Sequence, residues 1–199
     1  TIFGARKKTA GKIFINGKEV TINTPKDAIR AGIGLVTEDR KQSGCFLPLS
    51  IRLNTVMAAL PQHCKGPFVQ QKKTGESAAA IKETLAVKAP STETIISNLS
   101  GGNQQKVLIG RWLLTEPEIL IFDEPTRGID VGSKAEIHRM ISDLAKQGKC
   151  IIMVSSELPE VMGMSDRILV MHEGELTGFV DRKDFSQETI MRYATGIVD

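Results

Sequence analysis

The sequence predicts an α/β fold in which a mostly parallel sheet carries helices on both faces. Short, wholly apolar segments at residues 33–36, 119–122 and 150–154 have the character of buried strands. Residues 133–147, between two of these strands, place apolar side chains at helical spacing, and Gly148 ends the pattern. Helices that alternate with buried strands are typical of a parallel sheet covered on both sides.

The N-terminal part of the chain is predicted to form a β-hairpin followed by a short helix. Asn16 and Gly17 lie between two alternating apolar segments of residues 12–22, which is a strong hairpin signal. Residues 25–31 follow as a short helix, and Gly32 closes it before the first buried strand.

Two helices are predicted between the first and second buried strands. Residues 50–60 and 76–87 have helical patterns, and Ser50 and Ser77 are placed to cap them. A polar stretch that contains Gly and Pro separates the two helices.

A third helix opens at Ser100 and is halted by Pro117. Together with the two helices before it, this helix completes an insert of about residues 50–115. We therefore expect a single domain over residues 1–199, with this helical subdomain inside it.

The C-terminal part is predicted to close the fold. Residues 168–171 and 176–180 flank Gly174 as the strands of a hairpin, and residues 182–195 form a final helical segment. Cys150 leads into the last buried strand and is expected to lie in the core.

Composition and charge exclude several kinds of protein. A formal net charge of +3 over 199 residues is too small to predict nucleic-acid binding. The three cysteines are scattered without a CxxC pair, which argues against a disulfide framework and fits a reducing cytoplasm. No signal peptide is evident, and no apolar run approaches the ~20 residues that a membrane-spanning helix needs.

Acidic residues follow the predicted strands, where parallel sheets bind ligands. A charged loop, residues 37–41, follows the first buried strand, and Asp123 and Glu124 follow the second. Asp123 is suited to hold Mg²⁺ through water beside nucleotide phosphates, and Glu124 to orient or deprotonate an attacking water. The alternative is that the two acids only cap a turn before Pro125.

Ser100, Gly101 and Gly102, named here the glycine turn, offer backbone N–H groups to an anion. Glycines allow close approach, and the helix behind them adds the positive end of its dipole. Alone, the turn could be no more than a flexible N-cap; with the acidic strand nearby, it indicates nucleotide phosphates and a metal ion. The sequence has no G-x-x-x-x-G-K-[ST] loop, which normally grips those phosphates.

This combination resembles the ATP-binding cassettes of ABC transporters. LSGGNQQ at residues 99–105 is similar to the signature motif of that family, and ILIFDE at 119–124 to its Walker B strand, with Glu124 at the position of the catalytic glutamate. Asp130 falls in the D-loop. Residues 11–20 resemble the stretch that follows the Walker A helix, so the chain is expected to be a fragment that begins just past that motif. The resemblance implies a P-loop NTPase-like fold, truncated at its N-terminus, that uses ATP and Mg²⁺.

Finer features resemble bacterial sugar importers of the ribose and galactoside type. LSGGNQQK, DEPTRGIDVG, TEDRK, VSSELPEV and MRYATG all agree with the second, C-terminal cassette of those two-cassette polypeptides. The implied function is to couple ATP binding and hydrolysis to monosaccharide uptake. The sugar cannot be read from this chain, because selectivity in such importers lies with the binding protein and the permease.

Two positions depart from the family pattern. Glu38 stands where the Q-loop glutamine is expected, and Ser156 stands where a switch histidine contacts the γ-phosphate. A serine is shorter than an imidazole and does not titrate near neutral pH. Glu124 would then lack its usual helper, which leaves an alternative function: a degenerate regulatory or structural cassette that does not itself hydrolyse ATP.

The resemblance also implies that the site residues serve two nucleotides, because cassettes pair head to tail. The signature residues would face the ATP held by the N-terminal cassette: Ser100, Gly101, Gly102 and Gln104. The others would line this cassette's own site: Asp123, Glu124, Glu38 and Ser156. The isolated chain is expected to bind ATP poorly and to be inactive.

The expected partners are the N-terminal cassette of the same polypeptide, the membrane permease subunits and, indirectly, a sugar-binding protein. This places the protein peripherally on the cytoplasmic face of a bacterial cell membrane. Residues 38–44 and the helical insert should dock on the permease. Phe46, Leu47 and Leu49 are either exposed apolar contacts there or part of the core.

Overall fold

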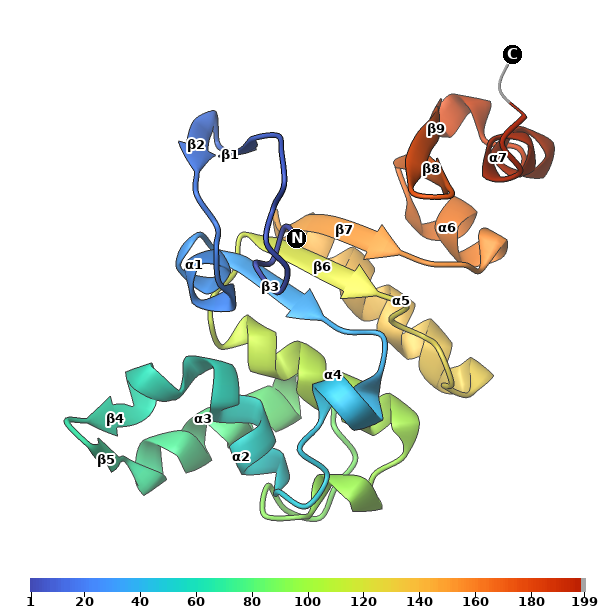
Figure 1. Cartoon of the computed structure of the whole chain (residues 1–199). Coiled ribbons are helices and arrows are strands. Elements are labelled where there is room, and N and C mark those ends of the chain that lie inside the picture. The colour runs from blue at the N-terminus through green and yellow to red at the C-terminus, as the bar shows by residue number, and fades with distance from the viewer. Residues whose placement is uncertain (198–199) are drawn as a thin grey trace. The chain divides into compact units, whose positions relative to one another are not determined.

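A three-stranded sheet lies at the centre of the first of two units into which the chain divides. The computed structural model describes residues 1–197; unit 1 ends at Ile152 and unit 2 begins at Met153, and each is described by itself. The strand order is β3 (Ile33–Val36), β6 (Ile119–Asp123), β7 (Cys150–Val154) (Figure 1). β3 and β6 pair in parallel, with Val36 opposite Phe122. The loops that follow these two strands therefore emerge at the same edge of the sheet.

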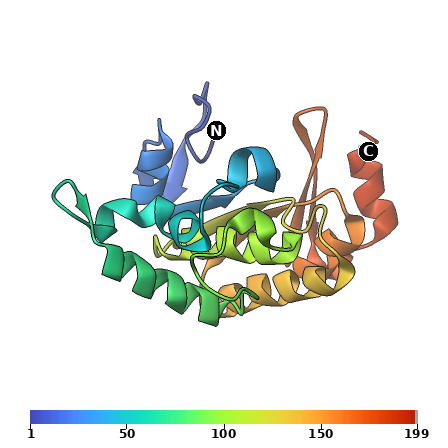
Figure 2. The ribbon, with the colours of Figure 1, turned by 90° about the horizontal axis from the view of Figure 1, so that it is seen from below.

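Helices lie on both sides of this sheet in unit 1, as the sequence predicts. One side carries α1 (Pro25–Arg30) beside the hairpin of β1 (Ile13–Ile15) and β2 (Lys18–Val20), and the other carries α4 (Gly101–Leu113) and α5 (Val131–Lys146) (Figure 2). On the first side, Ile22, Ala28 and Ile33 belong to one buried cluster. Gly34 lets α4 approach β3, because an added Cβ there would lie 3.2 Å from the Cβ of Trp112.

Short helices and a small hairpin form the segment between β3 and α4. These are α2 (Ile51–Val56), the 3₁₀ segment η2 (Met57–His63), β4 (Cys64–Lys65), β5 (Phe68–Val69), α3 (Gln71–Thr84) and the 3₁₀ turn η3 (Ile96–Asn98). Ser50 caps α2 as predicted, since its Oγ accepts a hydrogen bond from the N–H of Leu53 at 3.3 Å.

The predicted cap at Ser77 is wrong. Ser77 lies inside α3, and its Oγ is 2.9 Å from Nε2 of His63. The helix begins earlier because Arg52 Nη1 donates to Oε1 of Gln71 at 2.5 Å and to Oγ1 of Thr74 at 3.0 Å. These contacts with α2 extend the helix over residues whose local pattern is polar.

The chain after β3 forms a π-helical turn, η1 (Arg40–Gly44), where the sequence predicts a plain charged loop. Oδ1 of Asp39 opens the turn by accepting hydrogen bonds from the N–H groups of Lys41 and Gln42 at 2.8 and 3.0 Å. Gly44 ends it against α4, where an added Cβ would lie only 2.8 Å from Cδ1 of Leu108. This segment is therefore packed against α4 rather than projecting freely.

The buried guanidinium of Arg111 joins α4 to α2 and η1. Its Nε and Nη2 donate to the backbone oxygen and Oδ1 of Asn54 at 2.7 and 2.9 Å, and its Nη1 donates to the Gly44 oxygen at 2.7 Å. The fully buried Asn54 side chain also accepts from the N–H of Phe46 at 2.9 Å and donates to its oxygen at 3.0 Å. Burial lowers the pKa of Arg111. One polar network thus fixes three segments relative to one another.

β7 differs from the prediction of a fully buried strand with a core cysteine. Cys150 is exposed, and Ile152 and Val154 are 40% and 50% exposed. In the described part of the sheet β7 has β6 as its neighbour on one side only. An apolar run does not distinguish a central strand from an edge strand, so the sequence pattern alone overestimates burial here.

Unit 2 contains the predicted hairpin and closing helical segment. Its elements are α6 (Leu158–Met164), β8 (Arg167–His172), β9 (Glu175–Asp181), the 3₁₀ turn η4 (Arg182–Asp184) and α7 (Gln187–Ala194). Ile168, Val180 and Ile190 are buried together in its core. None of the helices in residues 1–197 combines the length and apolar character needed to cross a lipid bilayer.

Replacing Arg111 with Lys is expected to lower the free energy of unfolding by about 2–4 kcal/mol. A lysine keeps the positive charge but cannot reproduce the planar fork, so buried acceptors on Asn54 and Gly44 would lose their donors. Urea denaturation measures the change. The matched control Arg139→Lys, at an exposed position on α5, should stay within about 0.5 kcal/mol of wild type. Equal losses in the two variants would contradict this role for Arg111.

Candidate functional site

The two carboxylates predicted to hold a metal and to orient water lie at the end of β6. Leu120 and Phe122 are fully buried, so the strand is fixed in the core up to Asp123. Glu124 has a φ of 47°, in the left-handed region, which turns the chain sharply after the strand. Burial and, second, the negative charge of Glu124 raise the pKa of Asp123. A cation at this edge would relieve that repulsion.

The donor chemistry at this edge suits Mg²⁺ held beside phosphates rather than an enclosed metal centre. Within residues 1–197, no three His, Cys, Asp or Glu side chains come together so as to surround an ion. Mg²⁺ does not need such a cage, because it keeps several waters and takes one or two carboxylates together with phosphate oxygens. Asp123, which is partly exposed at the sheet edge, is compatible with that kind of binding.

The charged loop after β3 contacts the acidic loop, residues 123–130, after β6. Glu38 forms an ion pair with Arg127. Arg40 donates from Nη1 to the backbone oxygen of Arg127 at 2.7 Å and from Nη2 to that of Gly128 at 3.2 Å. The structure thus brings Glu38 to the acidic loop. Neither arginine is among the site residues predicted from the sequence; the available signal was that each lies a few residues after a buried strand.

The glycine turn packs against both of these loops. An added Cβ at Gly101 would lie 3.0 Å from Nη2 of Arg40 and 3.4 Å from the backbone oxygen of Gly128. An added Cβ at Gly102 would lie 2.5 Å from Cβ and Oγ of Ser133 in α5. Ser100 is exposed at the N-cap of α4, and its Oγ accepts a hydrogen bond from Asn103 at 2.8 Å. Packing inside this chain therefore requires a glycine at Gly102, whereas a side chain at Gly101 would crowd the end of the Arg40 side chain.

Gln104 and Asp130 are each engaged locally. The buried amide of Gln104 donates to the backbone oxygens of Ile96 at 3.1 Å and Leu99 at 3.3 Å, which ties the glycine turn to the segment before it. Asp130 is the N-cap of α5, where its Oδ1 accepts from the N–H of Ser133 at 3.0 Å. That hydrogen bond lowers the pKa of Asp130. Neither contact tests their predicted roles at ATP.

Ser156 lies in unit 2, where it is exposed just before α6. Its neighbour Ser155 accepts a hydrogen bond at Oγ from the N–H of Glu157 at 3.0 Å, which shapes the turn into the helix. The role of Ser156 in place of a switch histidine stays a prediction.

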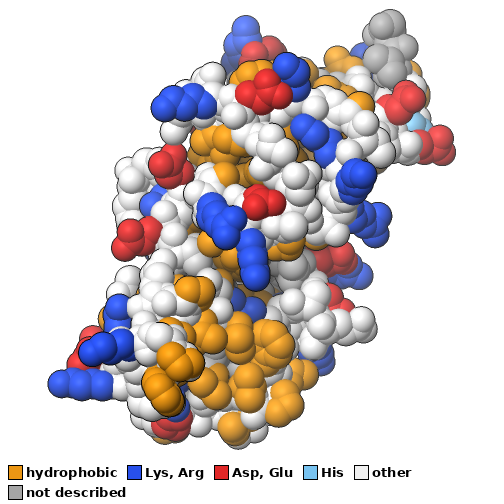
Figure 3. Space-filling model, turned by 60° about the vertical axis from the view of Figure 1, so that its left-hand side comes forward, with side chains coloured by type: hydrophobic (Ala, Val, Ile, Leu, Met, Phe, Trp, Pro, Cys, Tyr) orange, Lys and Arg blue, Asp and Glu red, His pale blue; other side chains and the backbone are white. Residues whose placement is uncertain are grey.

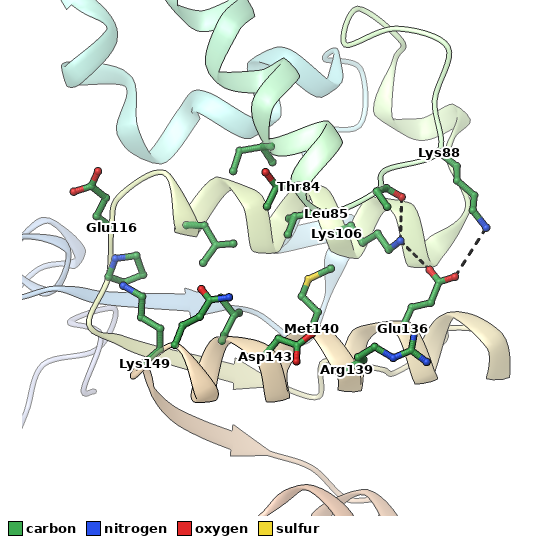
Figure 4. Close-up of a pocket in the computed structure, with 16 residues that line it drawn as sticks. Thr84, Leu85, Lys88, Lys106, Glu116, Glu136, Arg139, Met140, Asp143 and Lys149 are labelled. Atoms are coloured by element: carbon green, nitrogen blue, oxygen red, sulfur yellow. Dashed lines mark hydrogen bonds and ion pairs between the residues drawn. The ribbon is translucent and has the colours of Figure 1, made fainter.

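A groove of about 640 Å³ runs between the end of α3 and the helices α4 and α5 (Figure 4). None of the residues predicted to bind a nucleotide or metal lines it. Lys106 is buried there; its Nζ donates to the Ala86 oxygen at 3.1 Å and pairs with Oε2 of Glu136 at 2.8 Å. This pairing lowers the pKa of Glu136. The last residue of LSGGNQQK thus joins the segment just after α3 to α5, and is not a phosphate ligand in this geometry.

Comparison with known proteins relates the chain to ABC transporters. The family model for ABC transporters matches residues 1–127. The chain is 54% identical, over 98% of its length, to a ribose/galactose/methyl galactoside import ATP-binding protein of Geobacillus kaustophilus, and 55% identical over 98% to one of Burkholderia cenocepacia. It matches the C-terminal half of these relatives. Because it covers 39% and 37% of them, the chain spans about two fifths of the length of the curated relatives it matches.

Solved ATP-binding cassettes share the fold. A cassette of an ABC transporter in its ADP conformation matches with a TM-score of 0.79 and 20% identity, covering 98% of this chain and 80% of that one. A nucleotide-free cassette matches with a TM-score of 0.78 and 21% identity, covering 98% and 77%. At these identities the likeness concerns the fold alone, and it confirms the cassette fold that the sequence predicts.

Gly102→Ala is expected to destabilise the chain by about 1–3 kcal/mol, because the new methyl group would overlap Ser133. Gly75→Ala is the matched control: Gly75 lies inside α3 with open space around it, so the change should be neutral or stabilise by up to about 1 kcal/mol. Adding Ser133→Gly to Gly102→Ala should recover part of the loss in urea denaturation. No recovery would contradict the packing argument.

Asp123→Asn is expected to raise the thermal midpoint at pH 7.5 in the absence of Mg²⁺. Folding raises the pKa of Asp123, so between the unfolded and the folded pKa the folded chain binds more protons than the unfolded chain. Wild-type stability therefore falls as the pH rises through this interval between the two pKa values. The advantage of the variant should shrink as the pH is lowered toward the unfolded pKa of about 3.9. Asp184→Asn, at an exposed carboxylate, is the control. An advantage that stays constant from neutral to acidic pH would contradict this.

Proposed function

The chain belongs to the ABC transporter family, and from that premise we propose that it is the C-terminal ATP-binding cassette of a two-cassette ATPase that drives monosaccharide import. The observation that carries the proposal is that the charged loop, the acidic loop and the glycine turn meet at one edge of the sheet. Those three segments hold the carboxylates and the anion-binding turn that phosphate chemistry needs.

The relatives support transport of a monosaccharide. They are named as ribose/galactose/methyl galactoside import ATP-binding proteins, and their greater length leaves room for a second cassette. We take residues 1–199 as one cassette, with the helical subdomain at about residues 50–115 inside it. The sugar itself is left open, since no residue of this chain need touch it.

Within this cassette's own site, Asp123 would hold Mg²⁺ through water and Glu124 would orient or deprotonate the attacking water. MgATP supplies the reactive γ-phosphate, and the metal neutralises charge on it. In a regular strand, two successive side chains point to opposite faces of the sheet. The sharp turn at Glu124 breaks this alternation, so the two adjacent carboxylates can take other directions. Glu38 would contribute by anchoring the acidic loop through Arg127.

The glycine turn would serve the other nucleotide, held by the N-terminal cassette. Ser100 is exposed at the N-terminus of the 13-residue helix α4, where backbone N–H groups and a hydroxyl are available to phosphate oxygens. The amide of Gln104 is occupied by the backbone of residues 96 and 99, so its proposed role is to hold the turn in shape for ATP. Asp130 would stabilise the start of α5 next to that turn.

A degenerate regulatory cassette is the alternative, and two observations favour it. Ser156 stands in place of a histidine, and a serine does not titrate near neutral pH. Glu38 stands in place of a glutamine and is engaged with Arg127. In that case the chain contributes the glycine turn and a docking surface without hydrolysing ATP at its own site.

Docking on a permease is the proposed role of the surface around residues 38–44 and the helical insert. Figure 3 shows apolar side chains gathered over the lower part of unit 1. Of the predicted contacts, Phe46 is 49% exposed, whereas Leu47 and Leu49 are partly buried. Phe68, in the hairpin between α2 and α3, is 76% exposed. Such docking would place the protein on the cytoplasmic face of the cell membrane, with a sugar-binding protein engaged indirectly.

Two substitutions in the intact polypeptide test the proposal. Ser100→Arg should abolish ATP hydrolysis, because a long cation would block the phosphate approach to the glycine turn. Glu124→Gln should lower the rate by about 10²-fold or more if this cassette hydrolyses ATP itself. Full activity of Glu124→Gln beside an inactive Ser100→Arg would establish the regulatory alternative.

The control for these measurements is Glu188→Gln, at an exposed position on α7, which should leave ATP hydrolysis unchanged. Sugar uptake into proteoliposomes containing the permease, with and without ATP, tests transport itself. If Ser100→Arg retains wild-type hydrolysis, or if ATP drives no uptake of any monosaccharide by the wild-type complex, the proposed function is wrong.

A further inference from the structure

The guanidinium of Arg40 lies where three separate segments of the chain meet. It belongs to η1, yet its two terminal nitrogens donate to backbone oxygens of the acidic loop, Nη1 to Arg127 at 2.7 Å and Nη2 to Gly128 at 3.2 Å. These bonds span 87 and 88 residues of sequence. A guanidinium presents its donors in a rigid plane, so it fixes the orientation of both carbonyl groups at once.

The third segment is the glycine turn. A Cβ on Gly101 would lie 3.0 Å from Nη2 of Arg40, and a Cβ on Gly128 would lie 3.6 Å from the same atom. The guanidinium therefore packs closely against Gly101, where a side chain would crowd it, and lies at ordinary contact distance from Gly128. Gly128 also has a φ of 65°, a backbone conformation that glycine adopts without the strain that a side chain brings.

A second contact between the charged loop and the acidic loop has its arginine on the acidic loop. Arg127 of the acidic loop forms an ion pair with Glu38 of the charged loop, while Arg40 of η1 binds the backbone of Arg127. Each loop thus sends an arginine to the other. Nε of Arg40 is buried and has no hydrogen-bond acceptor among the described residues, so the two terminal nitrogens make the hydrogen bonds that hold the guanidinium.

We infer that Arg40 is a positioning residue that holds the glycine turn and the acidic loop at a fixed spacing. This rests on the proposed function, in which the glycine turn faces one nucleotide and the acidic loop faces the other. A displacement of either segment would then be transmitted through one guanidinium to the other segment and to residues 38–44. Arg40 would in this way couple the two ATP sites to each other and to the permease-docking loop.

Hydrogen exchange on the intact polypeptide tests the structural part without reference to activity. Arg40→Ala should accelerate exchange of backbone amides in both residues 99–103 and residues 124–130, while the core of α7 stays at the wild-type rate. Arg40→Lys should give an intermediate result, because a lysine reaches one carbonyl group and not both. The control Arg139→Ala should leave both segments unchanged. Unchanged exchange in either segment of Arg40→Ala overturns the inference.

Steady-state kinetics of the same polypeptide test the functional part. A loss of positioning should lower kcat by about tenfold or more, whereas the KM for ATP should change less than about twofold because no phosphate contact is removed. A purely structural role predicts a lower thermal midpoint with kcat per folded molecule unchanged, and that outcome overturns the inference. If wild type hydrolyses no ATP, the proposed function fails and the exchange measurement still decides whether Arg40 joins the segments.

A double-mutant cycle separates Arg40 from general disruption. Gly101→Ala pushes a methyl group against the Arg40 guanidinium, so its effect on exchange in residues 124–130 should be large in wild type. In the Arg40→Ala background that methyl group has space, and the same substitution should have a much smaller effect. Additive effects of the two substitutions overturn the inference.

Discussion

The buried guanidinium of Arg111 constrains much of unit 1, because its three acceptors come from two segments distant in sequence. The bonds to Asn54 and Gly44 fix α4 against α2 and against the end of η1. Since α4 begins at the glycine turn and η1 begins at Arg40, the same network sets where both of those features lie. Arg111 lies ten residues after the start of α4, so a polar contact inside the core helps to position the site at the sheet edge.

Glycines allow α4 to be approached closely from several directions. Gly34 of β3 lets α4 pack closely on that strand, and Gly102 in the first turn of α4 lets α5 pack closely on the helix. At Gly110 of α4, an added Cβ would lie 2.2 Å from Cγ2 of Ile81 in α3. A helix packed on three sides in this way has little freedom to rotate or slide, because in a close-packed interior even a small displacement raises the free energy steeply. Packing along α4 therefore makes the glycine turn rigid. Its two glycines allow this packing in addition to the close approach of an anion.

The features that could be predicted from the sequence are those that local chemistry determines. The Asn16-Gly17 hairpin, the strands β3 and β6, the Ser50 cap and the apolar face of α5 each depend on residues within one element. Arg40 could not be predicted, because its partners lie more than eighty residues away and are backbone atoms with no sequence signature. Ser77 and Cys150 were assigned wrongly for the same reason: tertiary contacts extend α3 past its local pattern, and strand order determines the exposure of β7.

Glu38 shows how a departure from a family pattern acquires a physical explanation. Glu38 adds a negative charge to the loop that contacts the acidic loop, in which burial and the charge of Glu124 already raise the pKa of Asp123. Its ion pair with Arg127 compensates that negative charge and at the same time joins the loops after β3 and β6. A glutamine at this position would offer Arg127 only a neutral carbonyl oxygen. Glutamate in place of glutamine therefore gives a charge-assisted hydrogen bond where glutamine would give a weaker neutral one. Because the pair is exposed to solvent, salt should weaken this tether more than it weakens the bonds from Arg40 to backbone carbonyls, which makes Arg40 the more durable connection between the two loops.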